Sequence, residues 1–143
     1  MTTIPHSHQA VFQRLHEATN SHDPEAISTA VDEVFDADAV FHTAIPARAS
    51  ARQTVKDAWT ILLRAFPDIQ VTVEETITEG DRTVFRNTVT GTHQGDYRGL
   101  PPTGRRITYD EVFILRFSGG RIVEGWGIVD VFSQLRQLGA IDA

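Results

Sequence analysis

The chain of 143 residues contains no cysteine, which excludes disulfide bonds, thiolate nucleophiles and sulfur-ligated metal sites. It also contains no run of eighteen apolar residues, so the sequence predicts no membrane-spanning segment. The opening stretch, MTTIPHSHQAVF, lacks a basic region followed by a long apolar run, and we therefore expect no signal peptide. Together these absences favour a cytoplasmic protein.

Basic residues are scarce as well, since 13 lysines and arginines stand against 19 aspartates and glutamates, for a formal net charge of −6. Binding to nucleic acid or to an anionic membrane surface needs a basic patch, so neither partner is expected. The hydrophobic fraction of 41% and the charged fraction of 22% are those of an ordinary globular protein. The length suits one domain over residues 1–143 with a real core.

Helices are predicted in the first half of the chain, where apolar residues recur at helical spacing. The second of them opens with Asp23-Pro24-Glu25, a capping carboxylate followed by proline at the first helical position. The predicted helices cover residues 8–19, 24–34 and 52–66. Between the second and third helices we expect a turn at 35–38, a short strand at 39–42 and a loop at 43–50.

Strands are predicted in the second half, because the apolar pattern there changes to alternation. They cover residues 69–78, 83–93, 106–117 and 121–131, and a short terminal helix follows from Val131 or Phe132. Helices followed by consecutive strands indicate an α+β fold, with the helices on one face of a curved antiparallel or mixed sheet. A curved sheet wrapped around helices forms a cone whose open mouth can hold a small ligand.

The last predicted strand carries two acids on a mostly apolar face. Ile122, Glu124, Trp126, Ile128 and Asp130 share one parity, and successive side chains of a strand point to opposite faces. An aspartate held against Trp126 in an apolar cavity would have a raised pKa and could act as a general acid/base. Asp130 could equally cap the terminal helix. Glu124 lies nearer the hairpin, where a rim carboxylate paired with an arginine is expected.

Glu111 is the polar exception on the apolar face that it shares with Tyr109 and Phe113. It is therefore a pocket candidate, although an ion pair with Arg86 would explain it equally well. The opposite face of this strand is polar, and we expect it to meet solvent or another subunit. That face carries Arg106, Thr108, Asp110 and Arg116.

Two histidines, His42 and His93, end predicted strands and could face a pocket, although a structural hydrogen bond is the commoner role for such a residue. No cluster of histidines and carboxylates has the spacing of a metal site, so no metal is predicted. Aromatic residues could line a cavity for a flat substrate, although each taken alone is more often part of the core. They are Trp59, Phe66, Phe85, Phe113 and Trp126.

Several short motifs occur in a fixed order from the third helix to the C-terminus. They are AFPD at 65–68, GDR at 80–82, GTHQG at 91–95, GLPPTGR at 99–105, RIVEGW at 121–126 followed by Asp130, and QLRQLG at 134–139. Together and in this order they resemble the SnoaL-like polyketide cyclases, within the larger group that shares the nuclear transport factor 2 fold. The resemblance extends from about residue 8 to residue 140.

The resemblance implies a cone-shaped α+β barrel with a deep pocket and no cofactor. The best-known members of the family close the last ring of an aromatic polyketide by intramolecular aldol condensation, and Asp130 matches their acid/base aspartate. The implied substrate is a small, hydrophobic, polycyclic or polyketide-derived molecule. The residues expected to bind it are Trp126, His93, His42, Trp59, Phe66, Glu111, Tyr109 and Phe113. Sheets of the family commonly pair, so a homodimer or homotetramer is expected.

Other functions of the same fold stand as alternatives to cyclisation. Some relatives assist hydroxylation, and epoxide hydrolases of the fold use an Asp–Arg–Asp arrangement that Arg86, Asp130 and Glu111 could imitate with different spacing. Steroid isomerases use a strand tyrosine, for which Tyr109 is the comparable residue. A non-catalytic module that binds a small ligand or a protein partner is the alternative from another class.

Overall fold

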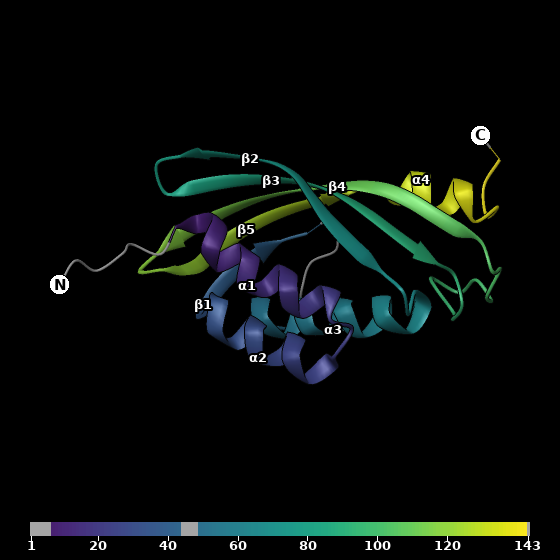
Figure 1. Cartoon of the computed structure of the whole chain (residues 1–143), viewed down its shortest axis with the longest axis horizontal. Coiled ribbons are helices and arrows are strands. Elements are labelled where there is room, and N and C mark those ends of the chain that lie inside the picture. The colour runs from purple at the N-terminus through teal and green to yellow at the C-terminus, as the bar shows by residue number, and fades with distance from the viewer. Residues whose placement is uncertain (1–6, 44–48, 143) are drawn as a thin grey trace.

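The computed structural model describes residues 7–43 and 49–142, which fold as helices packed against one curved sheet (Figure 1). The elements in order are α1 (His8–Asn20), α2 (Pro24–Val34), β1 (Phe35–His42), α3 (Ala51–Ala65), β2 (Gln70–Glu79), β3 (Arg82–Thr92), β4 (Arg106–Ser118), β5 (Arg121–Val129) and α4 (Val131–Gln137). Helices therefore precede the long strands, and the predicted α+β class is confirmed.

Each of the first three helices begins at a capping side chain, as the start signals in the sequence indicate. The side chains of Ser7, Asp23 and Ser50 accept hydrogen bonds from the backbone N–H groups of the first turn. The apolar faces of α1 and α2 are buried, while the corresponding face of α3 is only half-buried before Ala65. The side chains of α3 therefore form the more open part of the helical layer.

The sheet has the strand order β1-β5-β4-β3-β2, with β1 parallel to β5 and the other pairs antiparallel. The turn predicted at 35–38 is wrong, because β1 already begins at Phe35. That side chain is buried against the core, its residue pairs with Ile122, and its carbonyl accepts hydrogen bonds from Arg52. Tertiary pairing thus overrides the turn preference of the Asp-Ala-Asp stretch. The loop predicted at 43–50 falls largely on residues 44–48, outside the described residues.

A β-bulge in β5 decides which side chains face the helices. Arg116 pairs with Glu124, but the next residue, Phe117, pairs with Ile122, so Val123 is an extra residue. Ile122 and Phe117 are buried on the concave face, whereas Glu124 and Trp126 lie on the convex face. The prediction that residues 122, 124, 126, 128 and 130 share one face is therefore wrong. The extra residue Val123 moves the later side chains of β5 to the face opposite Ile122, although the residues still alternate in the sequence.

Two glycines occupy the concave positions of β5 after the bulge. A Cβ atom at Gly127 would lie 2.6 Å from the ring of Phe113, and one at Gly125 would lie 3.0 Å from the ring of Phe41. Both rings consequently pack directly on the backbone of β5. This close approach brings β1 and β4 side chains together over the middle of the concave face.

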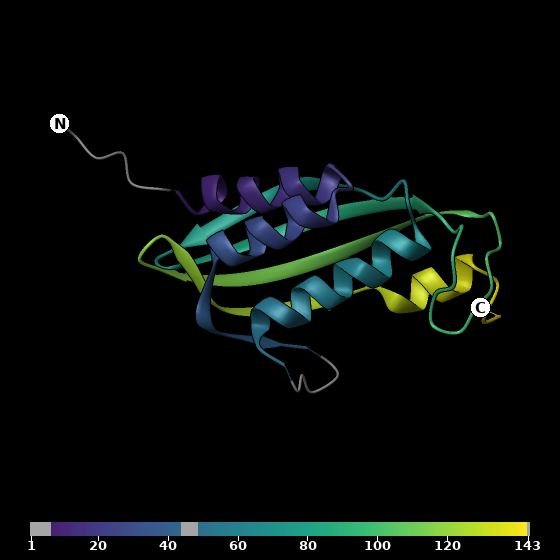
Figure 2. The same cartoon turned by 90° about the horizontal axis from the view of Figure 1, so that it is seen from below.

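Figure 2 shows the helices of the first half of the chain lying over one face of the sheet. The buried residues form two hydrophobic clusters. The first joins α1 and α2 to the hairpin half of the sheet, and the second joins the end of α3 to Tyr97, Tyr109 and Leu138. Trp59 and Leu63 of α3 pack against both clusters. The helix α3 therefore spans the boundary between them.

Candidate active site

A polar pair lies in the middle of the concave face. Glu111 of β4 is opposite Asn87 of β3 on one side and Val129 of β5 on the other. The side-chain amide of Asn87, which is fully buried, donates a hydrogen bond to Oε1 of Glu111 at 3.2 Å. A carboxyl group thus faces the helical layer from the centre of an otherwise apolar surface.

Desolvation in this position raises the pKa of Glu111 from 4.5 to about 7, and the hydrogen bond from Asn87 opposes the shift. The predicted alternative of an ion pair with Arg86 is wrong, because that guanidinium instead pairs with Glu75 at 2.8 Å. Neighbouring residues on one strand point to opposite faces, which separates Arg86 from Asn87. Glu111 therefore has the pKa that general acid/base chemistry needs near neutral pH.

Apolar side chains of the sheet lie beside this carboxyl on the concave face, and side chains of α3 pack against the neighbouring cluster that holds Tyr109. Phe113 and Val129 from the sheet and Trp59, Leu62 and Leu63 from α3 are all half-buried, so solvent reaches this wall. The closest backbone approaches of α3 are to β1 and α2. Its Trp59 and Leu63 side chains pack against clusters that include residues of β4. Such a wall suits a flat apolar ligand.

Phe66 and Tyr109, both predicted to bind substrate, are buried in the second cluster. Phe66 packs beside Tyr97, and the backbone of Gly91 approaches its ring closely. Burial and the nearby charge of Glu111 raise the pKa of Tyr109, so this phenol stays protonated. Tyr109 is therefore a neutral polar group two residues from Glu111 on the same face of β4.

Asp130 occupies the point where β5 ends and α4 begins. Its Oδ1 accepts a hydrogen bond from the backbone of Ser133 at 3.0 Å, and its own N–H donates to the carbonyl of Asp110 at 3.1 Å. The side chain is exposed. The helix-capping interpretation of the sequence is thus the one that the hydrogen bonds support.

An open hollow of about 450 Å³ lies at the end of the β4–β5 ladder, beside α4. Both Glu111 and Asp130 belong to its lining. The remaining lining residues are mostly apolar, and two of them, Ile128 and Phe132, are strongly exposed. The two acidic candidates thus border one hollow, although only Glu111 is desolvated.

His42 and Trp126 lie together on the convex face, away from the concave side of Glu111. Their rings stack with centroids 5.1 Å apart, and Arg82 lies over the indole. Nε2 of His42 lies 2.8 Å from Glu124, which also accepts a hydrogen bond from Arg116 at 3.1 Å. The expected pairing of Glu124 with an arginine is confirmed, while the structure does not bring His42 and Trp126 into the concave site.

His93 is fully buried at the end of β3 and holds the following loop. Its Nδ1 accepts a hydrogen bond from the backbone N–H of Thr103 at 3.2 Å, and its backbone pairs with Arg105 and Gly104. Within the part of the chain that the structure describes, Nε2 has no hydrogen-bond partner. These contacts give His93 a structural role in fixing the loop at residues 94–105.

Three polar residues that the sequence reasoning passed over belong to this region: Asn87, Tyr97 and Gln134. Asn87 interrupts the buried parity of β3 between Phe85 and Val89, and the same signal singled out Glu111. Gln134 is four residues before the buried Leu138, so it shares the inward face of α4. A search for polar residues on otherwise buried faces could therefore have identified Asn87 and Gln134, but not Tyr97.

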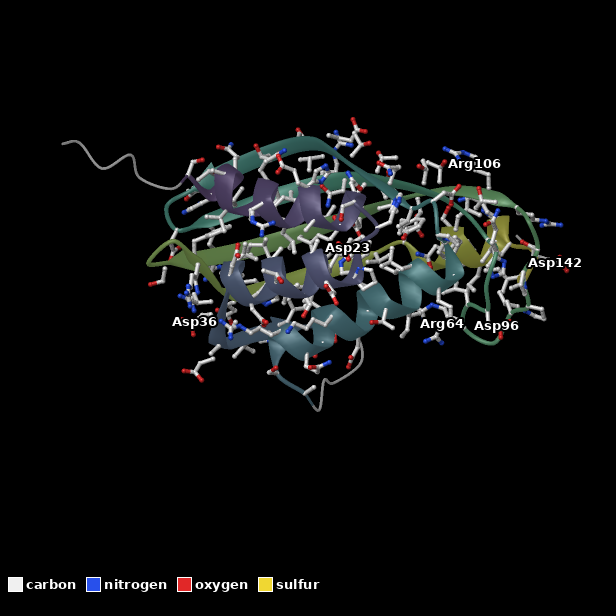
Figure 3. All side chains as sticks on the ribbon, turned by 60° about the horizontal axis from the view of Figure 1, so that its bottom comes forward. Asp23, Asp36, Arg64, Asp96, Arg106 and Asp142 are labelled. Atoms are coloured by element: carbon white, nitrogen blue, oxygen red, sulfur yellow. The ribbon has the colours of Figure 1, made fainter. Side chains whose placement is uncertain are left out.

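Charged side chains elsewhere lie at the periphery, and Figure 3 shows Arg64, Asp96 and Asp142 at the same end of the molecule.

Over residues 7–43 and 49–142, no group of three histidines, cysteines or carboxylates is placed to hold a metal ion. No helix among these residues is long and apolar enough to cross a membrane.

Solved structures with the same architecture define the class. TsrD from Streptomyces laurentii is 24% identical, with a TM-score of 0.83 over 98% of this chain and 100% of that one. This likeness and the mixed curved sheet identify a nuclear transport factor 2-like fold. A search of the curated proteins gives no match.

The SnoaL-like polyketide cyclase family matches residues 9–138, and the chain belongs to this family. IdmH from Streptomyces antibioticus, a proposed polyketide cyclase, is 34% identical, with a TM-score of 0.77 over 92% of this chain and 97% of that one. AclR from Streptomyces galilaeus, a proposed hydroxylase, is 32% identical, with a TM-score of 0.81 over 94% of this chain and 82% of that one. The predicted family and fold are thereby confirmed.

Proposed function

We propose that the protein is a cofactor-independent cyclase that closes a ring of a polyketide-derived substrate by an intramolecular aldol-type reaction. The observation that carries the proposal is the half-buried Glu111, whose desolvated carboxyl has its pKa raised to about 7 beside half-buried apolar side chains. Membership of the SnoaL-like family and the likeness to IdmH support a cyclase reaction.

In this proposal Glu111 is the general acid/base. Its carboxylate removes a proton from a carbon next to a carbonyl group, and the protonated form returns a proton to the alkoxide that ring closure creates. A pKa near the operating pH serves both steps. The apolar residues Val129, Val131 and Phe132, which line the same hollow as Glu111, hold the substrate so that its two reacting carbons are close, and this positioning lowers the barrier further.

Asp130 is the acid/base that the family resemblance implies, and it remains the alternative to Glu111. Both residues border the same hollow, but Asp130 is exposed and engaged as the cap of α4. Desolvation therefore favours Glu111 as the group that exchanges protons with the substrate.

The test is an assay with an anthraquinone that carries an acetic ester group and, on the adjacent ring carbon, a side chain with a ketone, followed by liquid chromatography and mass spectrometry. Aldol closure without loss of water gives a product of unchanged mass. We expect Glu111→Gln to lower turnover by about 10²–10⁴-fold, the usual contribution of general acid/base catalysis. Asp130→Asn is the matched variant, since asparagine also caps a helix. A large loss in Asp130→Asn alone would assign the role to Asp130 instead.

Assisted hydroxylation is the second candidate function, and the likeness to AclR is the observation that favours it. The same assay separates the two reactions, because hydroxylation adds one oxygen atom to the mass of the substrate. A protein that binds the anthraquinone and returns it unchanged would instead be a binding module.

We also propose that the convex face of the sheet pairs with a second copy of the chain. Val40 and Ile114 are exposed there, around the Trp126 side chain that His42 and Arg82 cover. Exposing these apolar residues to water is unfavourable, and a dimer that buries them is more stable than the separate monomers.

A further inference from the structure

The side-chain amide of Asn87 has a hydrogen-bond partner at one end and none at the other. Its nitrogen Nδ2 donates to Oε1 of Glu111 at 3.2 Å. Its oxygen Oδ1 is buried and, over residues 7–43 and 49–142, has no hydrogen-bond partner. A buried acceptor without a donor destabilises a fold, so this atom calls for an explanation.

The neighbours of Asn87 on the concave face include one side chain that can supply the missing donor. Phe85 and Val89 lie on either side of it along β3, and Val73 lies opposite on β2. These three are apolar. The fourth neighbour, directly opposite on β4, is Glu111. Opposed residues of an antiparallel pair have Cβ atoms about 4.5–5.5 Å apart, which is within reach of a second hydrogen bond.

The protonation state of Glu111 decides whether Oδ1 of Asn87 is satisfied. An ionised carboxyl has acceptors only, so it leaves Oδ1 without a donor. A protonated carboxyl carries one O–H group and keeps its other oxygen as an acceptor. The acid and the amide then form two hydrogen bonds side by side, from Nδ2 to Oε1 and from the O–H group at Oε2 to Oδ1. Both ends of the buried amide are bonded in this state.

The other ionisable groups near Glu111 do not bond to its carboxyl. Tyr109, two residues earlier on the same face, stays protonated because burial raises its pKa. Asp130 is exposed and caps α4, and Asp110 lies on the opposite face of β4. The side chains that α3 packs against the neighbouring cluster are apolar. Over residues 7–43 and 49–142, Asn87 is the one side chain hydrogen-bonded to Glu111.

We propose that Asn87 is the positioning residue of Glu111, and that it binds the protonated carboxyl by two hydrogen bonds and the carboxylate by one. Oε1 stays bound to Nδ2 in both states, so Oε2 is the oxygen that exchanges its proton. Glu111 borders the hollow at the end of the β4–β5 ladder, where a substrate meets this oxygen. The hydrogen bonds belong to the resting protein, and their part in the reaction rests on the proposed cyclase function.

In the reaction the proton is held by this pair without a further reactant. Oε2 takes the proton from the substrate carbon, and the released electron pair forms the new carbon–carbon bond. The π pair of the attacked carbonyl moves onto its oxygen. Oδ1 of Asn87 binds the proton on Oε2 until the ring has closed, and Oε2 then gives the proton to the alkoxide. The product is therefore an isomer of the substrate.

The test is isotope-edited infrared spectroscopy of the wild-type protein over a titration that includes the midpoint of Glu111. The chain contains two asparagines, Asn20 and Asn87, so asparagine labelled with carbon-13 at Cγ gives two side-chain carbonyl bands. Asn20 bonds to the backbone of Val71 through both ends of its amide. The band that is absent from Asn87→Leu, or from Asn87→Thr where the leucine variant does not fold, belongs to Asn87.

The direction of the band shift separates the proposal from simple donation by Nδ2. Acceptance of a hydrogen bond from Oε2 lowers the carbonyl stretching frequency of Asn87 when Glu111 gains its proton. If Nδ2 only donated, loss of the carboxylate charge would weaken that bond and raise the frequency. We expect the frequency to fall as Glu111 is protonated and to be independent of pH in Glu111→Gln. A rising or constant frequency in the wild type would overturn the proposal.

The kinetic constants test the positioning role. Because Asn87 acts through Glu111, we expect Asn87→Leu to lower kcat and kcat/KM equally, by about 3- to 10-fold for one hydrogen bond, with KM unchanged. Thr88→Val is the matched control, since it removes a hydrogen bond to Asp110 on the opposite face of the same strand pair. It should change neither kcat nor the Asn87 band. Equal losses in the two variants, or a raised KM with unchanged kcat, would contradict positioning.

The two proposals fail separately. A falling Asn87 frequency in a protein that returns the anthraquinone unchanged would uphold the hydrogen-bonded pair and contradict the proposed cyclisation. Turnover by a protein in which the Asn87 frequency rises would do the reverse.

Discussion

Glu111 and Asp130 are both carboxylic acids at the edge of one hollow, yet their surroundings give them different properties. Glu111 is desolvated on the concave face, and Asp130 is exposed and hydrogen-bonded to the first turn of α4. Alternation alone indicated an acid on an apolar face for each of them. It is correct for Glu111, which lies in an uninterrupted strand, and fails for Asp130, which follows a bulge.

The raised pKa of Glu111 predicts a pH-dependent stability. A carboxyl whose pKa is higher in the folded protein stabilises the fold fully below about pH 4.5, and this contribution is lost as the pH rises through about 7. Each pKa unit corresponds to about 1.4 kcal/mol, so the wild type should lose roughly 3 kcal/mol relative to Glu111→Gln over this range. Urea unfolding of both proteins from pH 4 to pH 8 measures it, and parallel stability curves would contradict it.

The capping role of Asp130 predicts a graded effect on stability. Asp130→Ala removes the acceptor for the N–H of Ser133 and should lower the free energy of unfolding by about 1 kcal/mol. Asp130→Asn and Asp130→Ser keep an acceptor and should lie close to the wild type. Chemical denaturation of the four proteins decides this, and equal stability of the alanine variant would show that the cap contributes nothing.

At the level of elements, the helices follow from the sequence more fully than the sheet does. Caps and apolar spacing are local signals, and they predict α1 and α2 together with their buried faces. Phe35 joins β1 only because it pairs with Ile122 far along the chain, and the bulge at Val123 depends on the register of two strands. Such non-local pairing leaves no periodic trace in the sequence.

The close packing over β5 predicts the effect of a single methyl group. Gly127→Ala would place a Cβ atom 2.6 Å from the ring of Phe113, so the ring or the strand would have to shift. We expect a loss of about 1–3 kcal/mol in the free energy of unfolding, typical of overpacking. The double variant Gly127→Ala/Phe113→Leu removes the opposing ring and should recover part of the loss. A fully stable single variant would show that β5 can move away from β4.

At the scale of the whole molecule, Trp59 and Leu63 join the two hydrophobic clusters. Because both clusters depend on α3, we expect them to unfold in one cooperative transition, as one domain does. Thermal unfolding followed by far-ultraviolet circular dichroism and by tryptophan fluorescence should give coincident curves. Two separate midpoints would mean that the clusters are independent folding units.

The convex face predicts the state of association. Ile114→Lys places a charge among the exposed apolar residues of this face and should shift the protein from dimer to monomer in sedimentation equilibrium. Ile61→Lys is the matched control, since Ile61 is an exposed isoleucine on α3. Equal masses for the two variants would exclude the convex face as the interface.

The account depends most on Glu111 as a desolvated, half-buried acid that titrates near neutral pH. Carbon-13 nuclear magnetic resonance of the protein with labelled glutamate carboxyl groups measures this directly, and Glu111→Gln assigns the signal. We predict that one glutamate carboxyl titrates with a midpoint near 7 and that this signal is absent from the variant. A spectrum in which every glutamate titrates between about pH 4 and 5, the ordinary range of an exposed glutamate, would contradict the account.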